Sequence, residues 1–123
     1  MKNLYNFLFL FILFLLIDSI YLKSSSNEWN SIIKNIQGTK ISFKMISALI
    51  TYIAIVFQVY YFIVLKNKPL TDAFLLGLTT YAIFDFTNYA ILKKWSLKMS
   101  IIDTLWGGIL YTLTVFVFRK IMK

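Results

Sequence analysis

Four long apolar runs constrain this chain more than any other feature of its sequence. A helix needs about 20 apolar residues to cross the roughly 30 Å hydrocarbon layer of a bilayer, and the runs cover residues 4–22, 43–65, 73–92 and 101–118. A soluble domain of 123 residues, 59% of them hydrophobic, could not bury so much apolar surface. We therefore predict an all-α integral membrane bundle of four transmembrane helices, a multi-pass protein whose single transmembrane domain covers residues 1–123.

The first run also has features of a secretory signal peptide. Against that interpretation, the run is long, it contains Asp18, and no pair of small residues with cleavage spacing follows it. We therefore predict that residues 4–22 form a membrane helix.

Two residue types are missing, and their absence excludes several kinds of catalytic and metal-binding site. The chain has no Cys, which excludes disulfides and thiolate ligands, and no His, which removes His-based triads and His-ligated metals. We expect neither a metal centre nor a cofactor, and no catalytic residue can be assigned. The net charge of +8 comes from basic residues that lie beside the apolar runs, and all of them except Arg119 are Lys. This pattern favours the lipid bilayer as a partner and argues against nucleic acid.

The connection between the first two runs contains a second helical pattern. Trp29, Ile32, Ile33 and Ile36 recur at helical spacing, and Gly38 follows as a C-terminal cap. The pattern predicts a short amphipathic helix over residues 27–37 that lies in the membrane interface. The alternative is a solvated loop with scattered isoleucines.

The distribution of Lys and Arg does not orient the bundle. With four spans, one side of the membrane holds six basic residues: Lys2, Lys66, Lys68, Arg119, Lys120 and Lys123. The other side, called the loop-1/3 side here, holds seven: Lys23, Lys34, Lys40, Lys44, Lys93, Lys94 and Lys98. Cytoplasmic loops are recognised by an excess of Lys and Arg. Six residues against seven show no such excess, so the sequence predicts neither the orientation nor the host membrane.

Three of the five acidic residues lie inside the apolar runs, where an ionisable side chain costs a few kcal/mol or more. Asp18, Asp85 and Asp103 all fall toward the loop-1/3 side, which predicts a shared polar pocket. Each also has a structural alternative. Asp103 completes a capping box begun by Ser100, Asp18 could pair with a nearby lysine (Lys23 or Lys44), and Asp85 could bond to a neighbouring helix.

Polar residues accompany these acids at helical spacing. In the third run, Gly77, Tyr81, Asp85 and Asn88 share one face and Thr87 flanks it. In the fourth run, Trp106 lies one turn after Asp103. The second run carries a stripe that suits close helix packing, made of Lys44, Ser47, Thr51, Ala54, Gln58 and Tyr61. The candidate ligand-binding residues are Asp18, Tyr81, Asp85, Thr87, Asn88, Asp103 and Trp106.

Two stretches carry a family resemblance. Residues 73–92 with Trp95, and the run Asp103-Thr104-Leu105-Trp106-Gly107, resemble the domain-of-unknown-function 2177 family of small predicted membrane proteins. The chain departs from the family pattern at Tyr21, where the family tends to have Trp. The resemblance implies a four-helix membrane protein and supplies no activity. It implies signature residues at Asp18, Asp85, Thr87, Asn88, Trp95, Asp103, Trp106 and Gly107.

Three functions fit these patterns. The first is a pocket that binds a cation, a proton or a polar lipid headgroup, in a transport-like protein that would act as a homo-oligomer because one copy is small for a conduit. The second is a membrane-embedded acid-base enzyme acting on a lipid or isoprenoid through paired carboxylates. The third is a structural or assembly subunit whose polar residues hold helices together.

Overall fold

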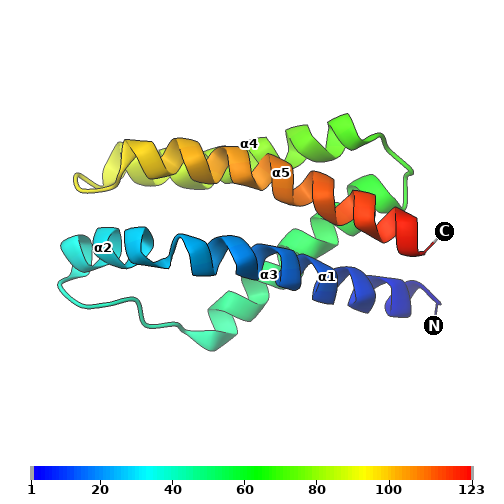
Figure 1. Ribbon diagram of the computed structural model, residues 1–123, viewed down its shortest axis with the longest axis horizontal. Coiled ribbons are helices and arrows are strands. Elements are labelled where there is room, and N and C mark those ends of the chain that lie inside the picture. The colour runs from blue at the N-terminus through cyan, green and yellow to red at the C-terminus, as the bar shows by residue number, and fades with distance from the viewer. Residues whose placement is uncertain (1, 123) are drawn as a thin grey trace.

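The protein is described here from a computed structural model, in which the backbone of residues 2–122 and the side chains of residues 3–122 are described. Within that part of the chain, all regular structure is helical (Figure 1). Met1 and Lys123, the ends of the predicted domain, and the Lys2 side chain lie outside it. The elements are α1 (Lys2–Ser24), α2 (Ser26–Gln37), α3 (Met45–Val59), the π-helical turn η1 (Tyr60–Val64), α4 (Leu70–Ile91) and α5 (Leu97–Ile121).

Three helical segments are long and apolar enough to cross a membrane: Asn3–Ser24, Met45–Val64 and Leu97–Ile121. The prediction of an all-α fold is therefore confirmed for the described residues, and three of the four predicted spans are found. The fourth, α4, has 22 residues, but Asp72, Asp85 and Asn88 make it less apolar than the others. The start of α1, the end of α5 and the connection before α4 lie at one end of the molecule, and α2 lies at the other (Figure 1).

The start of α5 overturns one interpretation of the sequence. The helix begins at Leu97, and the hydroxyl of its N-cap Ser96 accepts a hydrogen bond from the backbone N–H of Met99 at 3.1 Å. Asp103 is therefore in the second turn of the helix and does not cap it. The hydroxyl of Ser100 instead donates to the backbone carbonyl of Ser96 at 2.9 Å. The capping-box alternative for Asp103 is wrong because the helix starts four residues earlier than the apolar run.

The segment predicted to be helical over residues 27–37 forms α2 in the structure, so the alternative of a solvated loop is wrong. The helix ends at Gly38, which has a φ of 84° and donates its N–H to Lys34. The apolar face of α2 packs against the α4–α5 connection, where Trp29 lies 5.7 Å from the ring of Trp95 and Ile32 is buried against Met99. Protein side chains thus cover a face that the sequence alone assigned to the membrane interface.

The closest helix pair is α4 with α5, which run antiparallel beside each other (Figure 1). Two glycines make this approach possible. A methyl group on Gly77 would collide with the carbonyl oxygen of Gly107, and one on Gly107 would collide with the ring of Tyr81. A third glycine, Gly108, lies under the ring of Phe74. Small residues that let backbones approach are the usual means of packing helices in membranes, where lipid is as apolar as the core.

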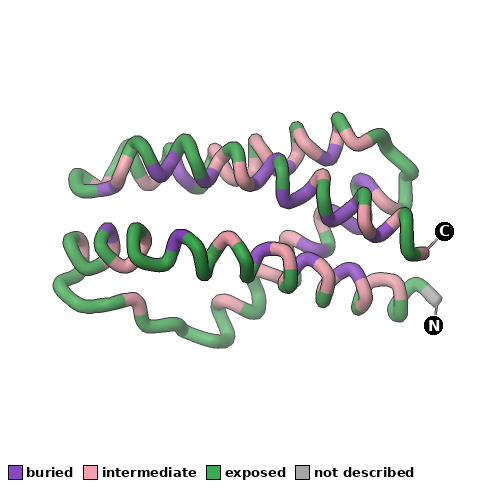
Figure 2. The backbone as a smooth tube through the Cα atoms, viewed as in Figure 1, coloured by how far each residue is buried: buried purple, intermediate pink, exposed green. Residues whose placement is uncertain are grey.

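The core lies where α1 and α3 meet α5. Figure 2 shows that buried residues follow α5 along its length, whereas the first half of α3 is exposed. Phe14 of α1, Val56 and Val59 of α3, and Tyr111 and Val115 of α5 are fully buried in this core.

The polar stripe predicted for the second run packs only in part. Gln58 is partly buried, whereas the other five members are exposed on this chain: Lys44, Ser47, Thr51, Ala54 and Tyr61. The prediction that this stripe packs within the bundle is therefore wrong for all but Gln58. The helix turns its more apolar face, with Val56 and Val59, toward α1 and α5, because those side chains fill the space between the helices at the close packing of a protein interior.

Candidate functional site

Asp18 ties three helices together. Its side chain is 4% exposed, and each carboxylate oxygen accepts one hydrogen bond. The phenol of Tyr52 on α3 donates to Oδ2 at 2.7 Å, and the indole Nε1 of Trp106 on α5 donates to Oδ1 at 2.9 Å. Asp18 therefore pairs with neither Lys23 nor Lys44, and this alternative is wrong. The carboxylate is held by hydrogen bonds from uncharged donors, which is how a buried acid is commonly accommodated.

Asp85 has no such partners. Its side chain is fully buried on α4, and neither carboxylate oxygen has a hydrogen-bond partner. The alternative of a structural side-chain hydrogen bond to a neighbouring helix is therefore not realised. Close helix packing instead places Asp85 against α5. Its backbone carbonyl accepts a hydrogen bond from the hydroxyl of Ser100 at 3.4 Å, three residues before Asp103, and the two carboxyl groups lie near enough to interact electrostatically. Two ionised carboxylates are acceptors only, so such a pair is stable when a proton or a cation lies between them.

Further oxygen atoms surround this carboxylate pair. Tyr21 stacks on Trp106 with ring centroids 5.0 Å apart and 15° between the planes, and its hydroxyl lies near Asp103. The hydroxyl of Thr104 lies near Asp85. Among the described side chains, six buried polar atoms lack a hydrogen-bond partner, and four of them belong to Tyr21, Asp85 and Thr104. Because buried polar atoms are rarely left unpaired, this concentration sets the carboxylate region apart from the rest of the described interior.

The structure brings together four of the seven residues singled out from the sequence, and a fifth, Tyr81, lies one turn before Asp85 on α4. Asp18, Asp85, Asp103 and Trp106 form the arrangement above. Tyr81 packs against Gly107, and its ring meets that of Tyr111 edge-on at 6.3 Å.

Two of the seven lie apart from that arrangement. Thr87 is exposed, because two residues along a helix turn a side chain to the opposite face from Asp85. Asn88 is partly exposed, one turn beyond Asp85 toward the end of α4.

Sequence reasoning missed Tyr52, Tyr21 and Thr104 as members of this site. Tyr52 lies one turn before Val56, on the apolar face of α3 that packs into the core. This four-residue spacing was the sequence signal that could have placed Tyr52 inside the bundle. Tyr21 and Thr104 lie beside candidate acids, three residues after Asp18 and one after Asp103.

A second polar network joins three helices through two hydrogen bonds. Tyr111 donates its phenol proton to Oε1 of Gln58 at 2.5 Å, and Nε2 of Gln58 donates to the hydroxyl of Thr80 at 2.9 Å. The network joins α5, α3 and α4 and holds them together. Each of its three side chains has a hydrogen-bond partner, which contrasts with the unpaired oxygens of Asp85.

The comparison with protein families comes to a single result. The family described as "Predicted membrane protein (DUF2177)" matches residues 3–118. The chain belongs to this family. Together with the three apolar helices, membership in the DUF2177 family establishes an integral multi-pass membrane protein. Comparison with curated proteins and with solved structures gives no match.

The geometry of the carboxylates limits which ligands fit this DUF2177 protein. Over residues 3–122, no three acidic side chains converge closely enough to hold a metal ion. The reason is that Asp18 directs both oxygens to Tyr52 and Trp106, which leaves Asp85 and Asp103 as a pair. Divalent cations usually take six or more oxygen ligands or several retained waters, which two carboxylates alone do not supply.

The Asp18 clamp generates a testable prediction. Trp106→Phe keeps a ring for stacking on Tyr21 but removes the donor to Asp18, and leaving that buried oxygen unpaired should destabilise the protein by about 1–3 kcal/mol. Thermal unfolding in detergent measures the loss. Trp95→Phe is the control, because Trp95 is also an indole packed in the protein, more deeply buried than Trp106, but its Nε1 has no hydrogen-bond partner. Equal losses in the two variants would show that ring size, and not the bond to Asp18, matters.

Proposed function

We propose that all four long helices, α4 included, cross the membrane. At about 1.5 Å per residue, the 22 residues of α4 extend about 33 Å, enough for the hydrocarbon layer. α4 lies antiparallel to α5, which is itself apolar enough to span. Asp85 is the residue of α4 whose exposure to lipid would cost the most free energy. It is fully buried against protein and so is shielded from lipid.

Site-specific labelling tests this topology. The chain has no Cys, so the exposed Lys66 and Lys93, which flank α4, can each be replaced by Cys without a background signal. In sealed vesicles of one orientation, a membrane-impermeant maleimide added outside should label only one of the two variants. Detergent permeabilisation should then make both react. Labelling of both variants in sealed vesicles would mean that α4 does not cross the membrane.

We propose further that Asp85 and Asp103 bind a proton or a small monovalent cation inside the membrane. The observation that carries this proposal is the full burial of Asp85 with both of its oxygens unpartnered, beside a second carboxylate. An ionised carboxylate removed from water without a compensating charge costs many kcal/mol. A bound proton or cation supplies that compensation.

The surroundings of the pair suit such an occupant. The hydroxyls of Tyr21 and Thr104 add two oxygen ligands or proton carriers, and Asp18 fixes the indole of Trp106 that stacks on Tyr21. In this arrangement Asp18 acts as a structural residue and Asp85 as the ligand-binding one. A structural role for one acid and a binding role for another thus coexist in the same site.

A transport-like role follows if the bound ion can leave toward either side. The carboxylate pair lies toward the loop-1/3 side, and a single chain of this size leaves little room for a path to the other side. We therefore propose a homo-oligomer in the bilayer. The exposed small and hydroxyl residues of α3, such as Ser47, Thr51 and Ala54, support it because such residues favour helix association in lipid.

Binding can be tested on the purified protein through its stability. A ligand that binds only the folded state stabilises it by about 2.7 kcal/mol at 100 times its dissociation constant. We expect the unfolding temperature of the wild type to rise when Na⁺ or K⁺ replaces N-methylglucamine at constant ionic strength, or to depend on pH at fixed salt. Asp85→Asn should remove that response.

Asp72→Asn is the matched control for this experiment. It makes the same change on the same helix, in the first turn of α4 and far from the carboxylate pair, so its response should equal that of the wild type. The cation series and the pH series separate the two possible occupants. A wild type that responds to neither, or an Asp85→Asn variant that responds as the wild type does, would contradict the proposal.

A further inference from the structure

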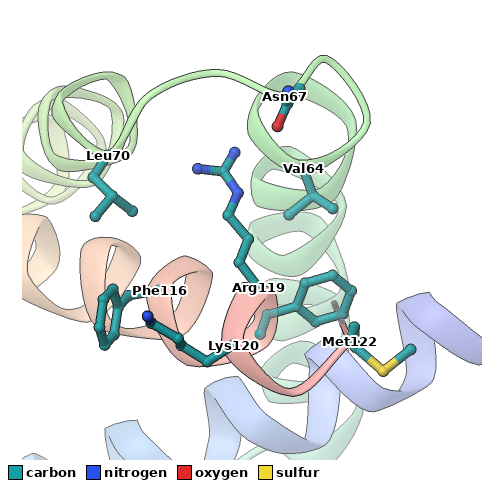
Figure 3. Close-up of a pocket in the computed structure, with 8 residues that line it drawn as sticks. Val64, Asn67, Leu70, Phe116, Arg119, Lys120 and Met122 are labelled. Atoms are coloured by element: carbon teal, nitrogen blue, oxygen red, sulfur yellow. The ribbon is translucent and has the colours of Figure 1, made fainter.

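A cavity of about 530 Å³ opens at the end of the bundle away from the carboxylates (Figure 3). It lies between the end of η1, the start of α4 and the last turns of α5. Arg119, which lines it, is 16 residues after Asp103 on α5, or about 24 Å along the helix axis. The cavity is thus separate from the proposed cation site, and the inference drawn from it does not depend on that proposal.

Arg119 is held in place at the centre of this cavity. Its Nη2 donates to the backbone carbonyl of Lys68 at 2.5 Å and lies 3.5 Å from that of Ile63. Figure 3 shows the guanidinium directed toward the connection between η1 and α4. These contacts use one terminal nitrogen, and a guanidinium has five N–H donors. The N–H groups of Nη1 and Nε have no hydrogen bond to a described residue, so each remains able to donate to an anion.

A second cation and an amide complete the polar part of the lining. Lys120 lies beside Phe116, with its Nζ 5.4 Å from the ring centroid. Asn67 has a φ of 50°, a left-handed conformation that Asn adopts more readily than most residues, and its side chain lines the cavity. Asp72 lies in the first turn of α4, close to the cavity along the chain, but it does not line the cavity. The charge of the lining is therefore positive.

The rest of the lining is apolar. Val64 and Leu70 face Arg119 from η1 and the start of α4. Phe118 comes from α5, and Met122 follows the last residue of that helix. Phe118 is the last residue of the fourth apolar run, and Arg119 follows it directly, so the cavity lies where hydrocarbon gives way to headgroups. A free inorganic anion would leave the apolar side chains unused, whereas an amphiphile would contact both parts.

We propose that this cavity binds the phosphate headgroup of an anionic phospholipid. Arg119 and Lys120 contact the phosphate, and Val64 and Leu70 contact the glycerol and the upper acyl chains. Basic pockets between helices at the membrane surface recognise anionic lipids through this combination of charge and apolar contact. The bound lipid also bridges α5 to the connection before α4, which Arg119 already joins through Lys68.

Native mass spectrometry of the detergent-released protein, with phosphatidylglycerol or phosphatidylcholine added, tests this site. We expect the wild type to keep one phosphatidylglycerol molecule in preference to phosphatidylcholine. Lys120→Gln should weaken that binding by about five-fold, the effect of one basic residue near an anionic headgroup. Lys120 has no hydrogen bond that holds the fold, so this variant tests binding even if changes at Arg119 prevent folding.

Lys94→Gln is the control, because Lys94 is an exposed lysine at the opposite end of the bundle and its loss should leave lipid binding unchanged. Equal weakening by both variants would show that general surface charge attracts the lipid, and would overturn the proposal. Equal binding of the two lipids would overturn it as well. Displacement of phosphatidylglycerol by millimolar inorganic phosphate, but not by chloride of the same ionic strength, would assign the cavity to free phosphate and overturn the lipid as its occupant.

Discussion

The close approach of α4 to α5 is the contact on which the rest of this structure depends. At Gly77 and Gly107 the two backbones lie so near that a methyl group on either residue would collide with the facing helix. Because lipid solvates apolar helices as well as a protein core does, such intimate packing is a principal source of stability between membrane helices. The same contact shields Asp85 from lipid and brings it beside Asp103. A carboxylate that would be costly on a lone helix is thereby retained inside the bundle.

The two best-defined acids of the site are accommodated in different ways. Asp18 receives one hydrogen bond at each oxygen and joins α1 to α3 and α5. Asp85 receives none, although it is fully buried. Paired buried polar groups stabilise a fold and specify its arrangement, whereas unpaired ones cost free energy unless something binds there. On the function proposed above, the paired acid belongs to the rigid framework of the bundle and the unpaired one to the binding site.

Much of this arrangement could be predicted from the sequence. Long apolar runs predict membrane helices directly. An ionisable residue within such a run carries a free-energy cost that indicates a specific role. The rotation of each helix was harder to predict. Apolar residues surround α3 on most sides, so periodicity did not show that Tyr52 faces Asp18 while Thr51 faces outward. The packing of α2 onto Trp95 also depends on a contact between segments distant in the sequence, which an amphipathic pattern alone cannot distinguish from contact with lipid.

The proposed site requires that the buried carboxylates of Asp85 and Asp103 change state when an ion or proton binds. Infrared difference spectroscopy of the protein in lipid bilayers observes carboxyl groups directly as the cation or the pH is exchanged. The account predicts a difference signal from a buried carboxyl group in the wild type that disappears in Asp85→Asn. A wild type without such a signal, or a variant that keeps the signal of the wild type, would contradict the claim.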